Sequence, residues 1–254
     1  MPKVLLERRG NVSILTLNRP EVHNCVDGET AEALATSIKS FASDDAAHVL
    51  IVTGAGEKSF CSGADLKHAD ELLAHSFVDE SGPMGFARLD PGKPVIAAVN
   101  GYCFAGGLEL AAWCDFRIAA DNAEFGALNR RWGVPFTDGG TQRFARIAGI
   151  GTALYLIETG IRIDAQKALA LGFVQEVVPA GTVVDRAFEL AERVAGYPQN
   201  SMRADREATL KGFGMPLRDA LALEAELCLK TVEDPELTAG LARYASGDRP
   251  DAPR

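Results

Sequence analysis

The chain has 254 residues, and its 26 basic and 35 acidic side chains give a formal net charge of −9. This balance argues against nucleic acid as a partner, because a phosphate backbone is bound by a basic surface. No apolar run approaches the ~18 residues of a membrane span, and no signal peptide is recognisable, so we expect a cytoplasmic protein without a membrane partner.

The first part of the chain alternates between strand and helix patterns. Val12–Leu17 alternates like a strand, and residues 29–42 then have the spacing of an amphipathic helix. Buried strands are predicted at residues 49–52, 95–99 and 116–119, and a short buried helix at residues 107–114. Strands that alternate with helices predict an α/β core with parallel strand pairing.

After about residue 141 the pattern becomes helical, apart from one predicted strand at residues 174–178. Helices are predicted over residues 141–147, 153–159, 165–171, 183–196, 201–211, 217–232 and 235–244. Residues 69–88 fit either a mobile loop or a broken helix. We therefore expect a core region, 1–195, followed by a helical C-terminal region, 196–254, in one functional unit.

Two segments of small residues, 59–66 and 100–110, each follow a predicted strand and precede a predicted helix. Backbone N–H groups at the first turn of a helix are unpaired and carry the positive end of the helix dipole. Two such groups that converge on one point form an oxyanion hole, which stabilises a carbonyl oxygen as it gains negative charge.

Other motifs favour structural interpretations. Residues 54–59 lack the spacing of a phosphate-binding loop and are better explained as a turn that ends a strand. Cys61 has no GxSxG elbow around it, so a packed thiol is favoured over a nucleophile. The five cysteines and four histidines show no metal-ligand spacing, so reduced thiols and no metal site are expected.

The chain resembles the crotonase (enoyl-CoA hydratase/isomerase) superfamily over nearly its whole length. The matching segments are residues 17–20 with Asn24, then 60–66, 94–101, 105–110, 114–119, 125–126, 139–143 and 168–174. The resemblance implies a spiral of ββα turns and a helical C-terminal region that forms homotrimers, often paired into homohexamers. It also implies an acyl-coenzyme A substrate and no separate cofactor, because coenzyme A is part of the substrate.

The resemblance also implies the catalytic residues. The amides of Ala64 and Gly106 would form the oxyanion hole, and Glu109 would be one of two glutamates that activate water. The second glutamate position holds Asn129, which can orient water but cannot exchange protons near neutral pH. Asp138 lies on a loop that borders the pocket in relatives, so it would either supply the missing carboxylate or cap the following helix.

Substrate contacts are implied around the same loops, which would flank adenine and pantetheine. The substrate-binding residues expected from the resemblance are Val22, Asn24, Ser62, Ala64, Asp65, Leu66 and Gly106. Lys58 and Lys67 are candidates for a phosphate contact, although loop lysines are more often solvated.

These observations favour an enoyl-CoA hydratase-like lyase of fatty acid metabolism, with Glu109 as general acid and base. An isomerase, decarboxylase or thioester hydrolase acting through the same enolate is an alternative, since a single carboxylate can move a proton between carbons. A non-catalytic acyl-CoA-binding protein is a further alternative. Asn129 favours it, and Glu109 opposes it.

Overall fold

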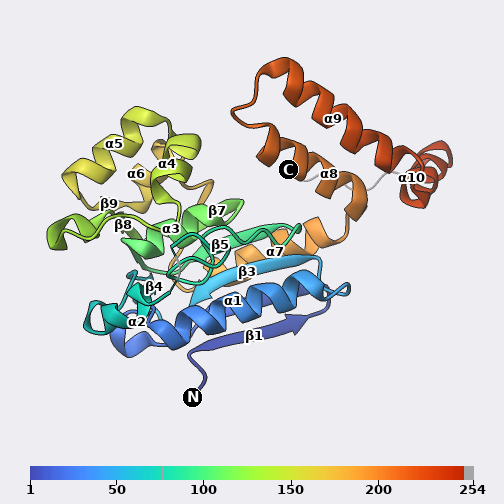
Figure 1. Cartoon of the computed structure of the whole chain (residues 1–254). Helices are drawn as coiled ribbons and strands as arrows, with labels where there is room; N and C mark the ends of the chain where they lie inside the picture. Colours follow the sequence, from blue (N-terminus) through green and yellow to red (C-terminus); the bar gives the residue numbers. More distant parts are fainter. Residues whose placement is uncertain (76, 249–254) are drawn as a thin grey trace. The chain divides into compact units, whose positions relative to one another are not determined.

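The computed structural model describes residues 1–75 and 77–248 (Figure 1). The chain forms two compact units, one spanning Met1–Glu192 and the other beginning at Arg193, and each is described by itself. Ser76, in the stretch expected to be a loop or broken helix, and residues 249–254 of the expected C-terminal region lie outside the described residues. No helix in the described ranges is long and apolar enough to cross a membrane.

The larger sheet of the first unit has six strands in the order β1-β2-β3-β5-β7-β10. Only the β1–β2 pair is antiparallel, and the other neighbours are parallel. Every residue of β3 and β5 is buried, which explains why these strands read as continuous apolar runs. The strands are β1 Val4–Arg9, β2 Val12–Leu17, β3 Val49–Gly54, β5 Val95–Val99, β7 Phe116–Ala120 and β10 Glu176–Val178.

A smaller sheet has the order β4-β6-β8-β9. Its strands are β4 Ser59–Cys61, β6 Tyr102–Phe104, β8 Glu124–Gly126 and β9 Ile163–Asp164. In three successive turns of the chain, a long strand of the first sheet is followed by a short strand of this one and then by a helical segment. This repeat is the predicted spiral of ββα turns. Its short strands were not predicted, because two or three residues are too few for an alternating pattern to be recognised.

The helices of this unit follow the predicted spacing. Helix α1 (Gly28–Ser43) buries Leu34, Ile38 and Phe41 on one face, which confirms the amphipathic helix expected there. The other helical segments are η1 Pro20–Val22, η2 Leu66–His68, α2 Ala69–Leu73, η3 Leu128–Trp132, α4 Gly140–Ala148, α5 Ile150–Thr159, α6 Ala165–Ala170 and α7 Val183–Ala195.

Helix α3 (Gly106–Trp113) is the most enclosed helix and carries Glu109. Every residue from its start to Ala112 is buried. A Cβ atom added to Gly107 would lie 2.0 Å from the Cys61 carbonyl oxygen, so only glycine permits this approach to β4. The helix is thereby held against the smaller sheet with its first turn beside the loop that follows β4.

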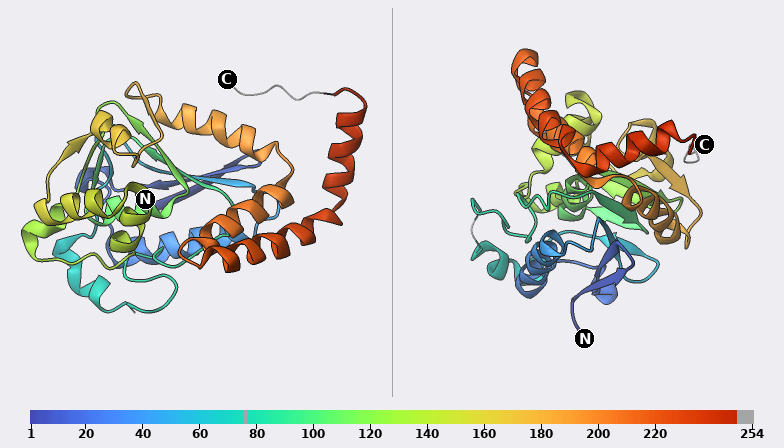
Figure 2. Two further views of the ribbon diagram at one scale, coloured as in Figure 1. Left: turned by 90° about the horizontal axis from the view of Figure 1, so that it is seen from above. Right: turned by 90° about the vertical axis from the view of Figure 1, so that its right-hand side faces the viewer.

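The second unit contains α8 (Gln199–Gly212), α9 (Leu217–Val232) and α10 (Pro235–Ala245). Helices α8 and α9 pack side by side (Figure 2). The predicted helices in this region are confirmed to within two residues at each end. Several of their large apolar side chains are exposed, namely Leu210, Leu217, Leu221, Leu229, Val232, Leu237 and Leu241.

Candidate active site

A cavity of about 520 Å³ opens in the first unit beside the start of α3. Its walls come from the loops after β4 and β6, from α2, from η3 and from residues 133–137. Of the residues predicted to form the site, the cavity is lined by Ser62, Ala64, Leu66, Gly106, Glu109 and Asn129. Residues far apart in the sequence are therefore brought to one surface.

The two small-residue segments meet at this cavity. A Cβ atom added to Gly63 would lie 2.7 Å from the Gly106 amide nitrogen and 3.0 Å from the Ala105 Cβ atom. Gly63 also has a φ of +91°, a conformation that side chains rarely tolerate. Glycine at this position lets the loop after β4 lie directly against the first turn of α3.

Two backbone amides are left with hydrogen-bonding capacity at this junction. The Val26 N–H donates to the Gly63 carbonyl, and the Val26 carbonyl accepts the Asp65 N–H. Ala64 lies between these two bonds. Gly106 is the first residue of α3, where an N–H has no partner within the helix. Neither the Ala64 nor the Gly106 N–H donates a hydrogen bond to another of the residues described.

Backbone strain is concentrated next to these amides. Ala105, which precedes α3, has φ 50° and ψ −122°, a combination that costs a non-glycine residue of order 1–3 kcal/mol. Its own N–H is held by the Gly126 carbonyl at 2.9 Å. The strained residue sets the direction of the Gly106 N–H, and such strain persists where the surrounding structure requires it.

Met84 lies over the same amide, which sequence reasoning missed. A Cβ atom added to Gly106 would lie 2.3 Å from the Met84 Sδ atom, so the thioether rests against the first turn of α3. The Met84 N–H donates to Asp138 Oδ1 at 3.1 Å. Met84 falls in residues 69–88, where no periodic pattern was present to predict its place.

Glu109 is buried and lines the cavity. Its Oε1 atom accepts hydrogen bonds from the backbone N–H groups of Asp138, at 2.9 Å, and Gly140, at 2.8 Å. No other hydrogen bond to the carboxylate is formed within residues 1–75 and 77–248, which leaves Oε2 as its unengaged oxygen. Burial, with a contribution from the neighbouring Asp138 charge, raises the pKa of Glu109 to about 8.

Asp138 lies behind Glu109 and does not line the cavity. It is fully buried, and its Oδ2 atom accepts from the Thr137 hydroxyl at 2.9 Å. Burial raises its pKa above the ordinary value. The helix-capping alternative is wrong, because α4 begins after Gly139 without a side-chain cap. The Asp138 side chain instead secures the loop that carries Met84.

Asn129 lines the cavity from η3 and is buried. Its Nδ2 donates to the Val134 carbonyl at 2.8 Å, and its own carbonyl accepts the Val134 N–H at 3.3 Å. Its Oδ1 atom is buried without a partner among the described residues. The amide therefore fixes the loop after η3, a role that its sequence position alone did not indicate.

Asn24 has its side chain engaged in the protein. Its Nδ2 donates to the carbonyls of Ala55 at 3.0 Å and Ser59 at 2.7 Å, and its Oδ1 accepts the Arg19 N–H at 2.9 Å. Both amide hydrogens are thus used, and the side chain ties η1 to the start of the smaller sheet. Val22, at the end of η1, is half-buried and does not line the cavity.

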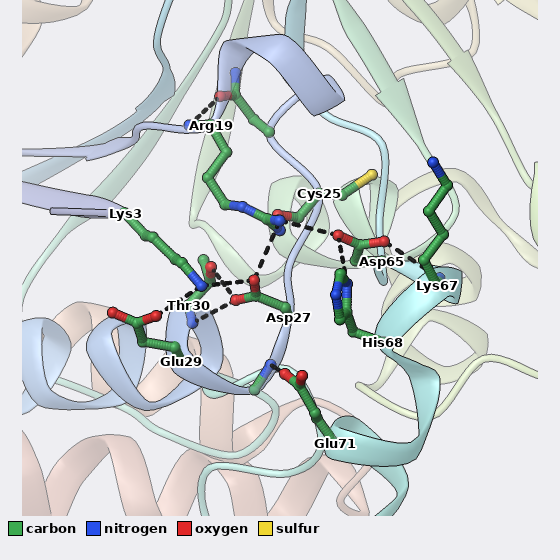
Figure 3. A network of polar contacts seen from close by, with 12 residues as sticks. Lys3, Arg19, Cys25, Asp27, Glu29, Thr30, Asp65, Lys67, His68 and Glu71 are labelled. Atoms are coloured by element: carbon green, nitrogen blue, oxygen red, sulfur yellow. Dashed lines mark hydrogen bonds and ion pairs between the residues drawn. The ribbon is translucent and has the colours of Figure 1, made fainter. Parts of the chain in front are cut away.

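Asp65 turns its side chain away from the cavity into an ionic cluster (Figure 3). Arg19 Nη2 lies 3.0 Å from Asp65 Oδ2 and 3.1 Å from Asp27 Oδ2, and Lys3 Nζ lies 2.8 Å from the same Asp27 oxygen. Burial alone would raise the pKa of Asp27, but hydrogen bonds from Lys3 and Thr30 outweigh it and lower that pKa to about 2. The cluster braces the residue that follows Ala64.

The remaining candidates lie at the surface. Lys58 and Lys67 are exposed and do not line the cavity, whereas Leu66 lines it and is 45% exposed. No group of three His, Cys, Asp or Glu side chains that could hold a metal ion occurs in the described part of the chain.

Comparisons with known proteins agree with this arrangement. A family model described as enoyl-CoA hydratase/isomerase matches residues 7–251. A short-chain-enoyl-CoA hydratase of Clostridium acetobutylicum is 37% identical over 88% of this chain and 87% of its own length. A 2,3-dehydroadipyl-CoA hydratase of Escherichia coli is 31% identical over 99% of this chain and 98% of its own. The crystal structure of an enoyl-CoA hydratase from Bacillus anthracis superposes with a TM-score of 0.91, at 33% identity, over 98% of both chains.

Proposed function

The chain belongs to the enoyl-CoA hydratase/isomerase family, and we propose that it adds water to the double bond of trans-2-enoyl thioesters of coenzyme A. The observation that carries this proposal is a buried carboxylate with a raised pKa, Glu109, on the same cavity as two unengaged backbone amides. Coenzyme A is part of both the substrate and the product, as in fatty acid metabolism, and no separate cofactor takes part.

The two amides stabilise the charge that the reaction creates. When water attacks the β-carbon, the electron pair of the double bond moves onto the thioester and gives an enolate. The N–H groups of Ala64 and Gly106 donate to the negatively charged enolate oxygen. The α3 dipole adds to the stabilisation because Gly106 begins that helix. One such donor is worth about 2.7–4 kcal/mol of transition-state stabilisation.

Glu109 carries the proton between water and carbon. Its Oε1 atom is fixed by two backbone N–H groups, so Oε2 takes the proton of the attacking water and returns it to the α-carbon of the enolate. A pKa of about 8 suits both steps near neutral pH, since efficient proton transfer needs a pKa close to the working pH. The water oxygen and one of its hydrogens remain on the β-carbon as a hydroxyl group, and the other proton goes to the α-carbon.

Asn129 favours isomerisation as a second candidate. Its amide holds Val134 and exchanges no proton, so one carboxylate remains at the cavity. A single carboxylate is sufficient to move a proton between carbons of the same enolate. Incubation in ¹⁸O-labelled water separates the reactions, because hydration places the label on the product and isomerisation leaves the product unlabelled.

Hydration is tested by mixing the protein with trans-2-enoyl-CoA and following the loss of absorbance of the conjugated thioester. We expect turnover by the native protein and strongly reduced turnover by Glu109→Gln. An equal rate in the two proteins, or no rate in either, would reject hydration catalysed by Glu109.

We further propose a cytoplasmic homotrimer or homohexamer. The large apolar side chains exposed on α8, α9 and α10 support self-association, because exposed apolar side chains that gather on a surface often mark a protein interface. All five cysteines are unpaired, which accords with a reducing compartment. Analytical ultracentrifugation that finds a monomer at micromolar concentration would contradict the assembly.

A further inference from the structure

The cavity has a wall composition that restricts the acyl group it can accept. Around Glu109 the wall is built largely from apolar side chains, and the remaining polar groups are the neutral Ser62, Asn129 and Thr137. Lysine and arginine are absent from the lining among the residues described. We propose that the enzyme takes uncharged acyl groups with an apolar extension beyond the β-carbon and rejects those that end in a carboxylate. This inference rests on the proposed function, whose substrate class it narrows.

Of the arginines near the cavity in sequence, Arg130 and Arg143 are engaged with protein carbonyls, and the exposed Arg131 does not line the cavity. Arg143 donates to the carbonyls of Asp138 and Ala87, and Arg130 donates to the Ile157 carbonyl at 3.2 Å. A terminal carboxylate on the acyl group would therefore enter an apolar space whose one ionisable wall group is itself an acid. A carboxylate held against this wall would lose part of its hydration and gain no cation in return, which is unfavourable.

Exposed apolar side chains on the cavity wall form the surface against which an acyl extension would pack. Trp132 on η3 is 71% exposed, and Leu73 at the end of α2 is 66% exposed, yet both line the cavity. Large apolar side chains that face a concave surface are typical of binding sites for apolar ligands. Asn129 holds the segment after η3 through Val134, so this part of the wall has a fixed position.

A matched pair of substrates tests the charge rule. We expect kcat/KM for trans-2-hexenoyl-CoA to exceed that for 2,3-dehydroadipyl-CoA, which carries a carboxylate at the end of an equally long chain, by about 100-fold or more. Trans-2-octenoyl-CoA should exceed crotonyl-CoA by about tenfold or more, since each buried methylene is worth roughly fourfold. Equal values within either pair would overturn the inference.

Binding of saturated thioesters keeps this test separate from that of the proposed function. In isothermal titration, hexanoyl-CoA should bind at least about tenfold more tightly than adipyl-CoA. Selective binding without turnover of any enoyl-CoA would reject the hydratase and uphold the acyl preference. Turnover of 2,3-dehydroadipyl-CoA at the hexenoyl rate would uphold the hydratase and reject the preference.

Trp132 offers a variant that changes the preference without disturbing a buried core. Trp132→Arg should raise kcat/KM for 2,3-dehydroadipyl-CoA relative to trans-2-hexenoyl-CoA by about tenfold, because it supplies the missing cation. Trp132→Ala should reduce the advantage of octenoyl over crotonyl substrate. Ile150→Ala, at a 70% exposed residue outside the cavity, is the matched control and should leave both ratios unchanged. Unaltered ratios in both Trp132 variants would contradict the proposed position of the acyl extension.

Discussion

Two groups of buried carboxylates in the same unit have opposite electrostatic settings. Asp27 and Asp65 surround the Arg19 guanidinium, and the pKa of each is held below its usual value. Glu109 and Asp138 lie together in an apolar environment, where burial raises the pKa of both. The first pair stays ionised and structural, whereas Glu109 can gain and lose a proton near neutral pH.

The difference shows that burial alone does not identify a catalytic acid. All four carboxylates are at least nine-tenths buried, but only Glu109 lines the cavity. The two pairs differ in their ion pairing, because Asp27 and Asp65 contact Arg19. They also differ in position, because Glu109 lines the cavity. Three substitutions test this separation, and a fourth tests the oxyanion donor beside Glu109.

Glu109→Gln should have the largest effect, lowering kcat for hydration by about 10²–10⁴-fold because the general acid and base is lost. It should not destabilise the fold. Since folding raises the pKa of Glu109 from 4.5 to about 8, the native free energy of unfolding falls as pH rises across that interval, and the glutamine variant lacks this fall. Urea unfolding at pH 5 and pH 8 checks the sign. A variant that is less stable than the native protein at pH 8 would contradict the assigned pKa.

Arg19→Met should act on stability, lowering the free energy of unfolding by about 3–5 kcal/mol because it leaves Asp27 and Asp65 buried without their shared cation. Chemical denaturation measures this change. Arg8→Met is the matched control, because Arg8 is half exposed and lies 3.5 Å from Asp44, and it should cost under about 1 kcal/mol. Similar losses of unfolding free energy in the two variants would show that the buried ionic cluster stabilises the fold no more than a surface ion pair does.

Gly106→Pro should lower kcat/KM by about 10²–10³-fold, because proline removes one oxyanion donor while fitting the first position of a helix. A Cβ atom at this position would collide with Met84, so the comparison is made in a Met84→Ala background. Gly106→Ala in that background keeps the N–H and isolates its contribution. Equal rates for the proline and alanine variants would show that the Gly106 N–H does not act on the substrate.

Asp138→Asn should have the smallest effect, because asparagine keeps an acceptor for the Met84 N–H, and the Thr137 hydroxyl can accept from the new amide group in place of donating. The pKa of Glu109 should fall, since the Asp138 charge helps to raise it. The acid-side limb of the kcat/KM–pH profile, which reports this ionisation, should move to lower pH. Asp70→Asn, the same charge change at an exposed residue of α2, should leave the profile unchanged. An unchanged pH profile in Asp138→Asn would show that the Asp138 charge does not influence the pKa of Glu109.

The α/β core and the two small-residue loops could be predicted from local patterns, and the spiral of ββα turns from the family resemblance. Gly63 follows strand β4 and Gly106 begins helix α3, so each lies in a strand-to-helix connection that the local sequence indicates. The amphipathic spacing of Leu34, Ile38 and Phe41 specifies α1 in the same way.

Side-chain destinations within the site could not be predicted, because they depend on distant partners. Asp65 accepts a hydrogen bond from Arg19, which is distant in the sequence. The Asn24 side-chain amide donates to the carbonyls of Ala55 and Ser59. Asp138 reaches Met84, in a segment without a periodic pattern. Contacts of this kind follow from tertiary packing, which a motif does not encode.

The central claim is that the Ala64 and Gly106 amides hold the thioester oxygen while Glu109 faces the reacting carbons. A crystal structure of the Glu109→Gln protein with a trans-2-enoyl-CoA tests it most directly. We predict a carbonyl oxygen within about 2.7–3.1 Å of both amide nitrogens, with the residue 109 side chain beside the double bond. A thioester oxygen bound elsewhere, or either amide bonded to a protein group in that complex, would contradict the account.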